Sequence, residues 1–257
     1  MNKALTDKTY WDDIFLKGRR VITYPDTRHN RFHMRLSRLF ARYIEKGSRV
    51  LEIGCGGSLW LPYLMKELQC EVSGIDYSEQ GLKKAEKHLR MQGDAYTLHR
   101  MDFLTPDPAL FQSFDTVFSV GVIEHFEDPS GIVGICKKFL RNQGLMITII
   151  PNTAGMLFGL QRIADRDIYD RHKSIRYDAL IEYHRGNGLE ILESSPIRFL
   201  DFSMINLHRV PPIPYRVLSW LARMINLPFL WCERELEIYF TPESLSSSLY
   251  VVARKVE

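Results

Sequence analysis

The chain has 257 residues, of which 45% are hydrophobic and 25% charged, a composition ordinary for a globular protein. This length suits one large domain with a sizeable core, so neither disulfides nor a structural metal is required for stability. A formal net charge of +3 does not by itself indicate a nucleic-acid partner, and no apolar run approaches the length of a membrane span.

The first residues and the cysteines predict a reducing compartment. The opening stretch MNKALTDKTYWDD lacks the apolar core of a secretory signal. Cys55, Cys70, Cys136 and Cys232 are scattered and form no Cys-x-x-Cys pair, which is typical of free, buried thiols. We therefore expect a cytoplasmic protein.

Residues 1–46 are predicted to form an amino-terminal helical cap. Arginines recur every three or four positions, so they would share one face of a helix whose other face is apolar. We expect this face to be solvated, and the alternative is a surface that attracts an acidic substrate, a phosphate-bearing carrier or an anionic membrane. The arginines are Arg28, Arg31, Arg35, Arg38 and Arg42.

Residues 47–203 alternate apolar, strand-like runs with helical segments. Such a rhythm is typical of a parallel sheet covered on both faces, so we predict a doubly wound α/β fold. The predicted strands are Val50–Ile53, Val72–Ile75, Tyr96–His99, Phe114–Val120, Leu145–Ile150 and Leu189–Glu193. The predicted helices are Leu59–Leu68, Ser78–Met91 with Ser78 as its N-cap, Pro129–Leu140 and Arg176–Arg185.

Residues 204–247 are predicted to be an insertion or lid in the same domain, before a last strand within residues 248–257. Within it, Met204–Glu235 is rich in Leu, Met, Trp and Pro, and Val217–Leu227 has the pattern of an amphipathic helix. We expect this helix to pack on the domain or to form a homodimer contact. The alternatives are a lid over an apolar or lipid-linked substrate and peripheral docking on a membrane.

A glycine-rich loop follows the first predicted strand in VLEIGCGGS, Val50 to Ser58. A dinucleotide fingerprint would need a third glycine at Leu59, and a P-loop would need a Gly-Lys pair that is absent from this loop. Asp76 ends the second strand in GIDYS, where a carboxylate can accept hydrogen bonds from both hydroxyls of a ribose. The loop and Asp76 together indicate a ligand that contains a nucleoside.

Four motifs in this order resemble the class I S-adenosylmethionine-dependent methyltransferases, most closely their small-molecule branch. They are VLEIGCGGS, GIDYS, Met101-Asp102 and FDTVFSVGVIEHFEDP. The resemblance covers roughly Val50 to Pro151, with a weaker similarity in HKSIRYDALIEYHRGNGLEIL. It implies a seven-stranded, mostly parallel sheet of the Rossmann-like methyltransferase type, S-adenosylmethionine as cofactor and S-adenosylhomocysteine as product.

The resemblance also implies which positions contact the cofactor. Glu52 and the loop backbone would face its methionine and ribose, Asp76 would hold the ribose, and Asp102 would accept from the adenine amino group. The residues after Asp76 and Asp102 would lie against the adenine, and the residues after the fourth strand would lie near the methyl group. An amino-terminal pair would belong to a helix that covers the cofactor; the alternative is that this pair only packs the helix. The implied set is Tyr10, Trp11, Glu52, Gly54, Cys55, Gly56, Asp76, Tyr77, Met101, Asp102, Phe103, Val120 and Gly121.

Two histidines are candidate catalytic residues that would take a proton from an acceptor hydroxyl. His125 follows the fourth strand, beside the implied methyl position, and His172 resembles a histidine that precedes the helix after the fifth strand. Histidine suits proton transfer near neutral pH, and Glu124 is placed to orient His125. The alternatives are that His125 only shapes the cofactor site and that His172 only makes a helix-end hydrogen bond.

Some classes of function are disfavoured. The resemblance implies that methyltransferases acting on DNA bases or amide nitrogens carry an Asn/Asp-Pro-Pro-aromatic motif after the fourth strand. This chain has Gly121 to Glu124 at that place and lacks the motif. No carboxylate-rich magnesium site is evident, and the helical pair His29 and His33 has no third ligand, so we expect no metal.

We predict methyl transfer to a small-molecule acceptor, anionic or lipid-linked, at oxygen: a natural product, a sugar or a carrier-linked precursor. The alternatives are an N-methyltransferase, an RNA methyltransferase that uses the arginine face, and a non-catalytic S-adenosylmethionine-binding protein. The near-neutral total charge disfavours a nucleic-acid partner.

Overall fold

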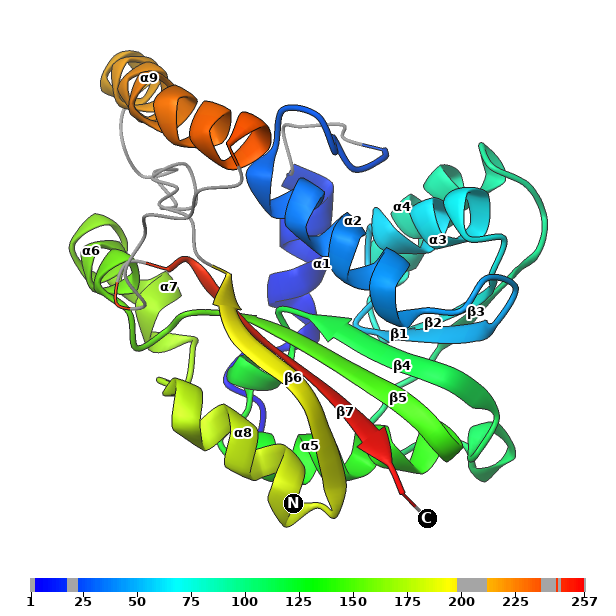
Figure 1. The fold of residues 1–257 in the computed structure, drawn as a ribbon. Helices are drawn as coiled ribbons and strands as arrows, with labels where there is room; N and C mark the ends of the chain where they lie inside the picture. Colours follow the sequence, from blue (N-terminus) through cyan, green and yellow to red (C-terminus); the bar gives the residue numbers. More distant parts are fainter. Residues whose placement is uncertain (1–2, 18–22, 198–211, 237–243, 245, 257) are drawn as a thin grey trace.

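A computed structural model of the chain describes residues 3–17, 23–197, 212–236, 244 and 246–256 (Figure 1). Its strands are β1 (Arg49–Ile53), β2 (Glu71–Asp76), β3 (Tyr96–Arg100), β4 (Phe114–Val120), β5 (Leu140–Pro151), β6 (Leu189–Ile197) and β7 (Ser248–Lys255). Its α-helices are α1 (Lys8–Lys17), α2 (Arg31–Tyr43), α3 (Trp60–Glu67), α4 (Glu79–Arg90), α5 (Pro129–Phe139), α6 (Met156–Ala164), α7 (Arg166–Asp170), α8 (Tyr177–Gly186) and α9 (Pro212–Glu235). Two short 3-10 helices are η1 (Pro108–Leu110) and η2 (Ile123–His125).

The strands form one seven-stranded sheet in the order β3-β2-β1-β4-β5-β7-β6. Strands β1 to β5 pair in parallel, and β7 runs antiparallel to both of its neighbours, β5 and β6. The predicted doubly wound, mostly parallel seven-stranded sheet is therefore confirmed.

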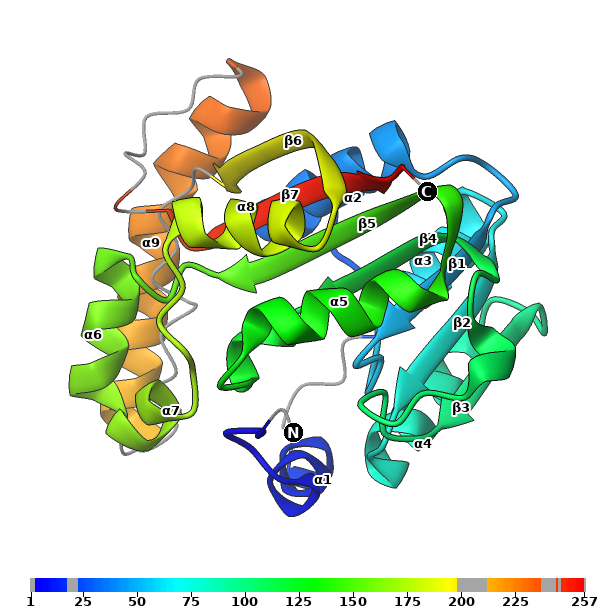
Figure 2. The same cartoon turned by 90° about the horizontal axis from the view of Figure 1, so that it is seen from below.

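Helices cover both faces of the sheet (Figures 1 and 2). One hydrophobic core joins the sheet to α2, α3 and α4 through side chains such as Phe40, Leu61 and Leu89. The other joins it to α5 and α8 through Ile132 and Leu180. Because both faces are covered, β1 and β2 are buried at every position after the first, the polar Glu52 and Asp76 included.

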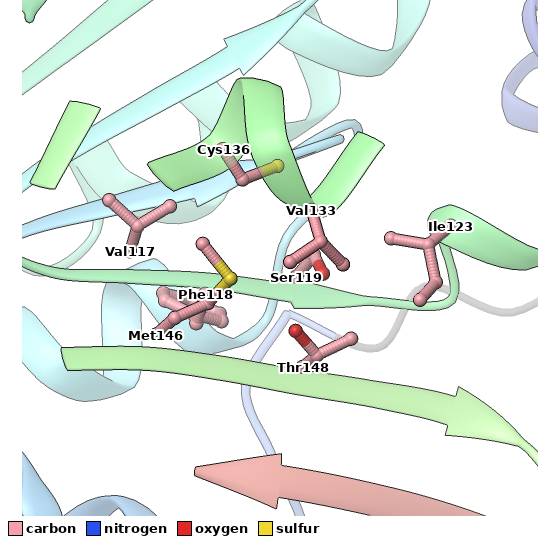
Figure 3. Close-up of a pocket in the computed structure, with 8 residues that line it drawn as sticks. All are labelled: Val117, Phe118, Ser119, Ile123, Val133, Cys136, Met146 and Thr148. Carbon is pink, nitrogen blue, oxygen red and sulfur yellow. The ribbon is translucent and has the colours of Figure 1, made fainter. Parts of the chain in front are cut away.

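Part of the second core is loosely filled between β4, β5 and α5 (Figure 3). The gap there has no room for a water molecule, so it is a packing defect of the core and no ligand site. Its lining residues are Val117, Phe118, Ser119, Ile123, Val133, Cys136, Met146 and Thr148.

Most predicted elements agree with the structure to within a few residues, and the differences have local causes. Ser78 is the N-cap of α4 as predicted, with its hydroxyl accepting from the Gly81 N–H at 2.9 Å. Strand β5 begins five residues earlier than predicted, at Leu140, which pairs with Phe114 before a register shift. The segment after β5, whose mixed sequence gave no clear periodicity, forms α6 and α7.

The predicted solvated arginine face is wrong. Arg28, Arg38 and Arg42 are exposed, but Arg31 is only 3% exposed and Arg35 is half-buried. Helical spacing identifies side chains on one face but does not show how much of the circumference is covered. In the first two turns of α2 burial extends around to the arginine positions, whereas in the last turn it does not.

The predicted helix at Val217–Leu227 is confirmed and extends over all 24 residues of α9, with Pro228 inside it. Our expectation that it packs its apolar side chains on the domain is wrong for the large ones that the structure describes, since these are 37% to 59% exposed. They are Val217, Leu218, Trp220, Leu221, Met224, Ile225, Leu227 and Trp231. Residues 204–211, 237–243 and 245 of the predicted insertion lie outside the described residues. Within the described part of the chain, no helix has the length and apolar character needed to cross a membrane.

Candidate active site

The carboxyl ends of β1, β2, β4 and β5 meet at one edge of the sheet, where ligands of doubly wound folds bind. The glycine-rich loop follows β1, and Asp76 ends β2. Gly54 has φ +73°, a conformation that favours glycine, and a Cβ there would lie 2.7 Å from Val122 Cγ2 in the loop after β4. Glycine thus lets the two loops touch.

The backbone N–H groups of residues 54–57 all donate to oxygens of the chain itself. Gly54 and Cys55 donate to the Ile75 carbonyl (2.9 and 3.1 Å), Gly56 to Asp76 Oδ2 (2.7 Å) and Gly57 to the Gly81 carbonyl (2.8 Å). A phosphate cradle needs N–H groups that point at the ligand. This loop therefore does not fit a pyrophosphate, in agreement with the absence of the dinucleotide and P-loop patterns.

Asp76 is 9% exposed, and its two carboxylate oxygens accept from the N–H groups of Gly56 and Ser78 at 2.7 Å each. Burial raises the pKa of this carboxyl, while the two backbone donors oppose that effect. Each carboxylate oxygen can accept a second hydrogen bond. The structural role as a cap and the predicted contact with ribose hydroxyls are therefore compatible.

Glu52 on β1 is buried beneath the loop and accepts a hydrogen bond from the Ser58 hydroxyl. Burial, aided by the nearby Asp76 carboxylate, raises the pKa of Glu52 to about 8, although the Ser58 hydrogen bond opposes this. Glu52 is therefore protonated near pH 7, and it lies next to the Asp76 carboxyl beneath the loop.

Helix α1 lies over the loop and brings a residue there that sequence reasoning missed. A Cβ on Gly56 would lie 2.5 Å from Phe15 Cζ, so the Phe15 ring covers the loop, and Asp12 accepts from the Ser78 hydroxyl at 2.5 Å. Of the two residues predicted to cover the cofactor, Trp11 lies 5.1 Å from the His125 ring after β4, and Tyr10 lies against the Arg171 guanidinium. Phe15 follows Trp11 by four positions and stacks on it, at 6.3 Å between ring centroids, so helical periodicity was the signal for it.

The residues expected near the adenine occupy mixed environments. Tyr77 is half-buried, and burial, then the charges of Asp76 and Asp102, raises its phenolic pKa. Asp102 is exposed at the end of β3, and Met101 is half-buried. Phe103 lies in the core, 5.6 Å from the Phe126 ring, so its aromatic face is already covered there.

The region after β4 begins with Val120 and Gly121, which are both partly buried. Gly121 has φ +71° and donates its N–H to the Ile149 carbonyl of β5 at 2.9 Å. This turn leads directly into η2, which carries Glu124 and His125.

A cavity of about 260 Å³ opens beside η2, and Tyr10, Trp11 and both candidate histidines form part of its wall. The His125 ring lies 4.5 Å from that of His172 and 5.1 Å from that of Trp11, and the Arg171 guanidinium lies 4.4 Å from the Tyr10 ring. The structure thus brings together His125 and His172, which the sequence had offered as two separate candidates. Lining residues that sequence reasoning missed are Pro151, Asn152, Leu157, Phe158, Gln161, Ile168 and Ser247.

The hydrogen bonds of the two histidines assign their tautomers. His125 Nδ1 lies 3.0 Å from the Arg171 carbonyl oxygen, and His172 Nδ1 lies 2.7 Å from the Ile168 carbonyl oxygen. Because a carbonyl only accepts, each Nδ1 carries the hydrogen and each Nε2 keeps its lone pair. Burial lowers the pKa of both rings, that of His125 to about 3 with a further contribution from His172, so both are neutral near pH 7.

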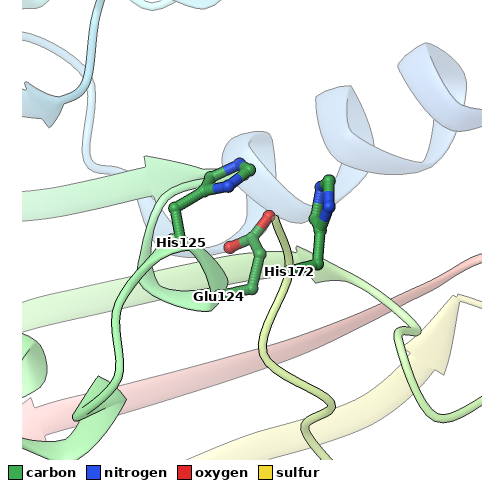
Figure 4. A group of neighbouring side chains, drawn as sticks. All are labelled: Glu124, His125 and His172. Carbon is green, nitrogen blue, oxygen red and sulfur yellow. The ribbon is translucent and has the colours of Figure 1, made fainter. Parts of the chain in front are cut away.

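Glu124 also faces this pair, with its carboxyl group between the two imidazoles (Figure 4). It is 1% exposed, burial raises its pKa to about 8, and its Oε2 has no hydrogen-bond partner among the described residues. From the sequence, Glu124 was expected only to orient His125. Glu124 and His125 are consecutive residues of η2, and both bring a polar side-chain atom to this point.

Comparisons with known proteins give a consistent result. Residues 51–148 match the family model described as a methyltransferase domain. The ubiquinone biosynthesis O-methyltransferase of Aromatoleum aromaticum is 33% identical over 155 residues, which cover 57% of this chain and 66% of that protein. The protein of the same name from Azoarcus sp. is 31% identical over 164 residues, covering 60% of this chain and 69% of that protein. The chain thus spans just under two thirds of the first of these relatives and slightly more of the second.

Solved structures share the fold at low identity. A chain from the complex between the Haloferax volcanii Trm112 methyltransferase activator and a methyltransferase matches with TM-score 0.66 and 19% identity, covering 96% of this chain and 98% of that chain. The Haemonchus contortus phosphoethanolamine N-methyltransferase 2, solved with S-adenosylhomocysteine, matches with TM-score 0.62 and 18% identity, covering 98% of this chain and 58% of that chain.

Proposed function

Because the chain belongs to the class I S-adenosylmethionine-dependent methyltransferases, we propose that it methylates an oxygen atom of a small-molecule acceptor. The observation that carries this proposal is the cavity beside η2, which is lined by two adjacent, neutral histidines whose Nε2 atoms keep a free lone pair. The relatives named as O-methyltransferases support oxygen as the methylated atom.

The residues around the glycine-rich loop suit the family's cofactor. S-Adenosylmethionine carries a positive sulfonium and an ammonium group, and Asp76 would supply the opposite charge while it also accepts from the ribose hydroxyls. Glu52, which is protonated near pH 7, would face the methionine and ribose end as a neutral hydrogen-bonding group. The full set of proposed cofactor contacts remains the one that the resemblance implied, with Phe15 added from α1. When bound, the cofactor supplies a methyl group whose bond to sulfur breaks as the bond to the acceptor oxygen forms, leaving S-adenosylhomocysteine.

The acceptor would occupy the cavity, whose walls are largely aromatic and aliphatic and whose polar end is formed by His125 and His172. These walls suit an apolar or aromatic molecule, and the polar end suits a hydroxyl group. We propose that the two histidines orient this hydroxyl toward the methyl group and that an Nε2 atom of the pair takes the hydroxyl proton as the bond to the methyl group forms, while Tyr10 and Trp11 help to exclude water. Alignment of this kind supplies much of the rate enhancement when the cofactor provides the reactive group.

An RNA methyltransferase would need an exposed arginine face on α2 to bind RNA. That face is not exposed as a whole, because Arg31 is buried and Arg35 is half-buried. An N-methyltransferase and a non-catalytic cofactor-binding protein remain alternatives that the acceptor search below distinguishes.

The first test is calorimetric titration of the full chain with S-adenosylmethionine, S-adenosylhomocysteine and NAD. We expect micromolar affinity for the first two and none for NAD. Asp76→Ala should weaken binding about 10- to 100-fold, since a hydrogen bond to a charged group contributes about 1.5–3 kcal/mol. The matched control is Asp128→Ala, which also removes a carboxylate that caps a helix start, in α5.

Binding of NAD alone, or equal affinity in Asp76→Ala and wild type, would refute the cofactor assignment. Wild-type protein would then be incubated with the cofactor and phenolic, sugar and amine acceptors, and S-adenosylhomocysteine would be measured. Turnover with amines alone would favour nitrogen as the methylated atom, and absence of turnover with every acceptor would favour a binding protein.

A further inference from the structure

Two buried side chains and one half-buried side chain outside the glycine-rich loop converge on one point (Figure 4). A carboxylate oxygen of Glu124 and one ring nitrogen each of His125 and His172 lie within 4.8 Å of one another. Among the described residues, no other group of three His, Cys, Asp or Glu side chains meets in this way. We propose that Glu124, His125 and His172 form a binding site for one divalent transition-metal ion.

The orientation of both imidazoles is the first support for this site. Each Nδ1–H donates to a backbone carbonyl, of Arg171 for His125 and of Ile168 for His172, which leaves both Nε2 lone pairs for a ligand. Histidines that bind metals almost always donate the other ring N–H to a carbonyl or carboxylate in this manner. The two carbonyls also hold the rings in place, so little reorganisation is needed to bind an ion.

The environment of Glu124 is the second support. The side chain is fully buried, Oε2 has no hydrogen-bond partner, and the ion pairs found among the described residues do not include it. An isolated buried carboxylate is costly unless a cation or a donor compensates it. A metal ion held between Glu124 and the two imidazoles would supply that charge.

The ligand set indicates the class of metal. Two imidazole nitrogens and one carboxylate suit Zn²⁺ or a similar ion such as Co²⁺ or Fe²⁺, whereas Mg²⁺ and Ca²⁺ prefer oxygen ligands. Three protein ligands also leave a coordination position open, as in catalytic zinc sites. His125 and His172 line the cavity, so the open position would face the proposed acceptor.

A role for this ion rests on the proposed function. A divalent ion at the polar end of the cavity would bind the acceptor oxygen and lower the pKa of its hydroxyl, making the oxygen a better nucleophile. The histidines would then position the acceptor through the ion and not by direct hydrogen bonds. Metal binding itself does not depend on the cofactor and is tested without it.

The experiment uses the full chain after removal of metal with a chelator. Zn²⁺ is titrated in competition with a chromophoric chelator, bound metal is counted by mass spectrometry after dialysis, and Co²⁺ is followed by its visible spectrum. We expect one ion per chain, a Co²⁺ spectrum of mixed nitrogen and oxygen ligation, and a higher melting temperature with Zn²⁺. Glu124→Gln, His125→Gln and His172→Gln should each weaken Zn²⁺ binding at least tenfold.

The matched control is His29→Gln, an exposed histidine outside the cluster, which should bind Zn²⁺ like the wild type. If a buried variant fails to fold, the half-buried His172→Gln carries the test. The proposal is overturned if the wild type binds no ion, or if His172→Gln binds Zn²⁺ as tightly as the wild type. Asp76→Ala should lose the cofactor and retain the metal, so a failure of this proposal is distinguishable from a failure of the proposed function.

Discussion

Replacing the buried carboxyl of Glu52 by an amide should change how stability depends on pH. In the folded chain burial holds the pKa of Glu52 at about 8, against an ordinary value of 4.5. The raised pKa means that the contribution of Glu52 to stability is complete below pH 4.5 and is lost as pH rises toward 8, because the unfolded chain ionises first. The free energy of unfolding should therefore fall by about 1.4 kcal/mol per pH unit in this window.

Glu52→Gln keeps the size of the side chain and a hydrogen-bonding group for Ser58 but has no proton to release. Between pH 5 and pH 8 the free energy of unfolding of the wild type should fall by about 4 kcal/mol more than that of Glu52→Gln. Urea unfolding followed by tryptophan fluorescence at each pH measures both curves. Other groups, Asp76 included, contribute to both proteins and largely cancel in the difference. Parallel curves for the two proteins would show that Glu52 is ionised when folded and would refute the reasoning.

The remaining predictions concern the loop and α9. Gly54→Ala should lower the free energy of unfolding by about 1–3 kcal/mol, because of the positive φ and the contact with Val122, and should abolish cofactor binding. Gly159→Ala in α6, where a Cβ meets nothing within 4 Å, is the control and should be neutral or stabilising by up to about 1 kcal/mol. If urea unfolding showed the same loss of stability for Gly159→Ala as for Gly54→Ala, the argument from the positive φ and the Val122 contact would be contradicted. Changing Trp220 and Trp231 together to Ser should leave stability within about 0.5 kcal/mol and reduce cosedimentation with anionic vesicles. A change from dimer to monomer in light scattering, with cosedimentation unaltered, would assign α9 to a homodimer contact.

Local chemistry explains which parts of the fold could be predicted. The strands β1, β2 and β4 could be predicted because strands covered on both faces are rich in apolar residues, and Ser78 could be predicted because an N-cap involves only residues three positions apart. The segment containing α6 and α7 was not readable, since its mixed composition shows no periodicity. Likewise, the burial of Arg31 depends on what packs around α2, which the sequence of α2 does not state.

In the candidate site, too, the positions of residues along the chain could be predicted, but the directions of their side chains could not. The order of motifs placed the glycine-rich loop after β1, Asp76 at the end of β2 and His125 after β4, because the carboxyl ends of parallel strands share one edge of the sheet. His172 follows α7, and its place beside His125 depends on how the segment after β5 folds back. The direction of single side chains was not predictable: Tyr10 and Trp11 face the cavity, Phe15 faces the loop, and Glu124 points to the same side as His125. These directions depend on how α1 and η2 pack on the sheet, which involves residues distant in the sequence.

The antiparallel strand β7 has a consequence for the order in which the molecule can assemble. β7 lies between β5 and β6 and is the one strand among the described residues that pairs with β6, although some fifty residues separate β6 from β7 in the chain. During synthesis, the strands that surround the glycine-rich loop are complete once β5 has left the ribosome, whereas β6 must wait for β7 with its backbone groups unpaired. Closing such a long-range pairing is slow compared with local steps. Until β7 is available, β5 has an unpaired edge and β6 has no partner strand. Chaperone binding or aggregation of the nascent chain would therefore begin at these unpaired strands.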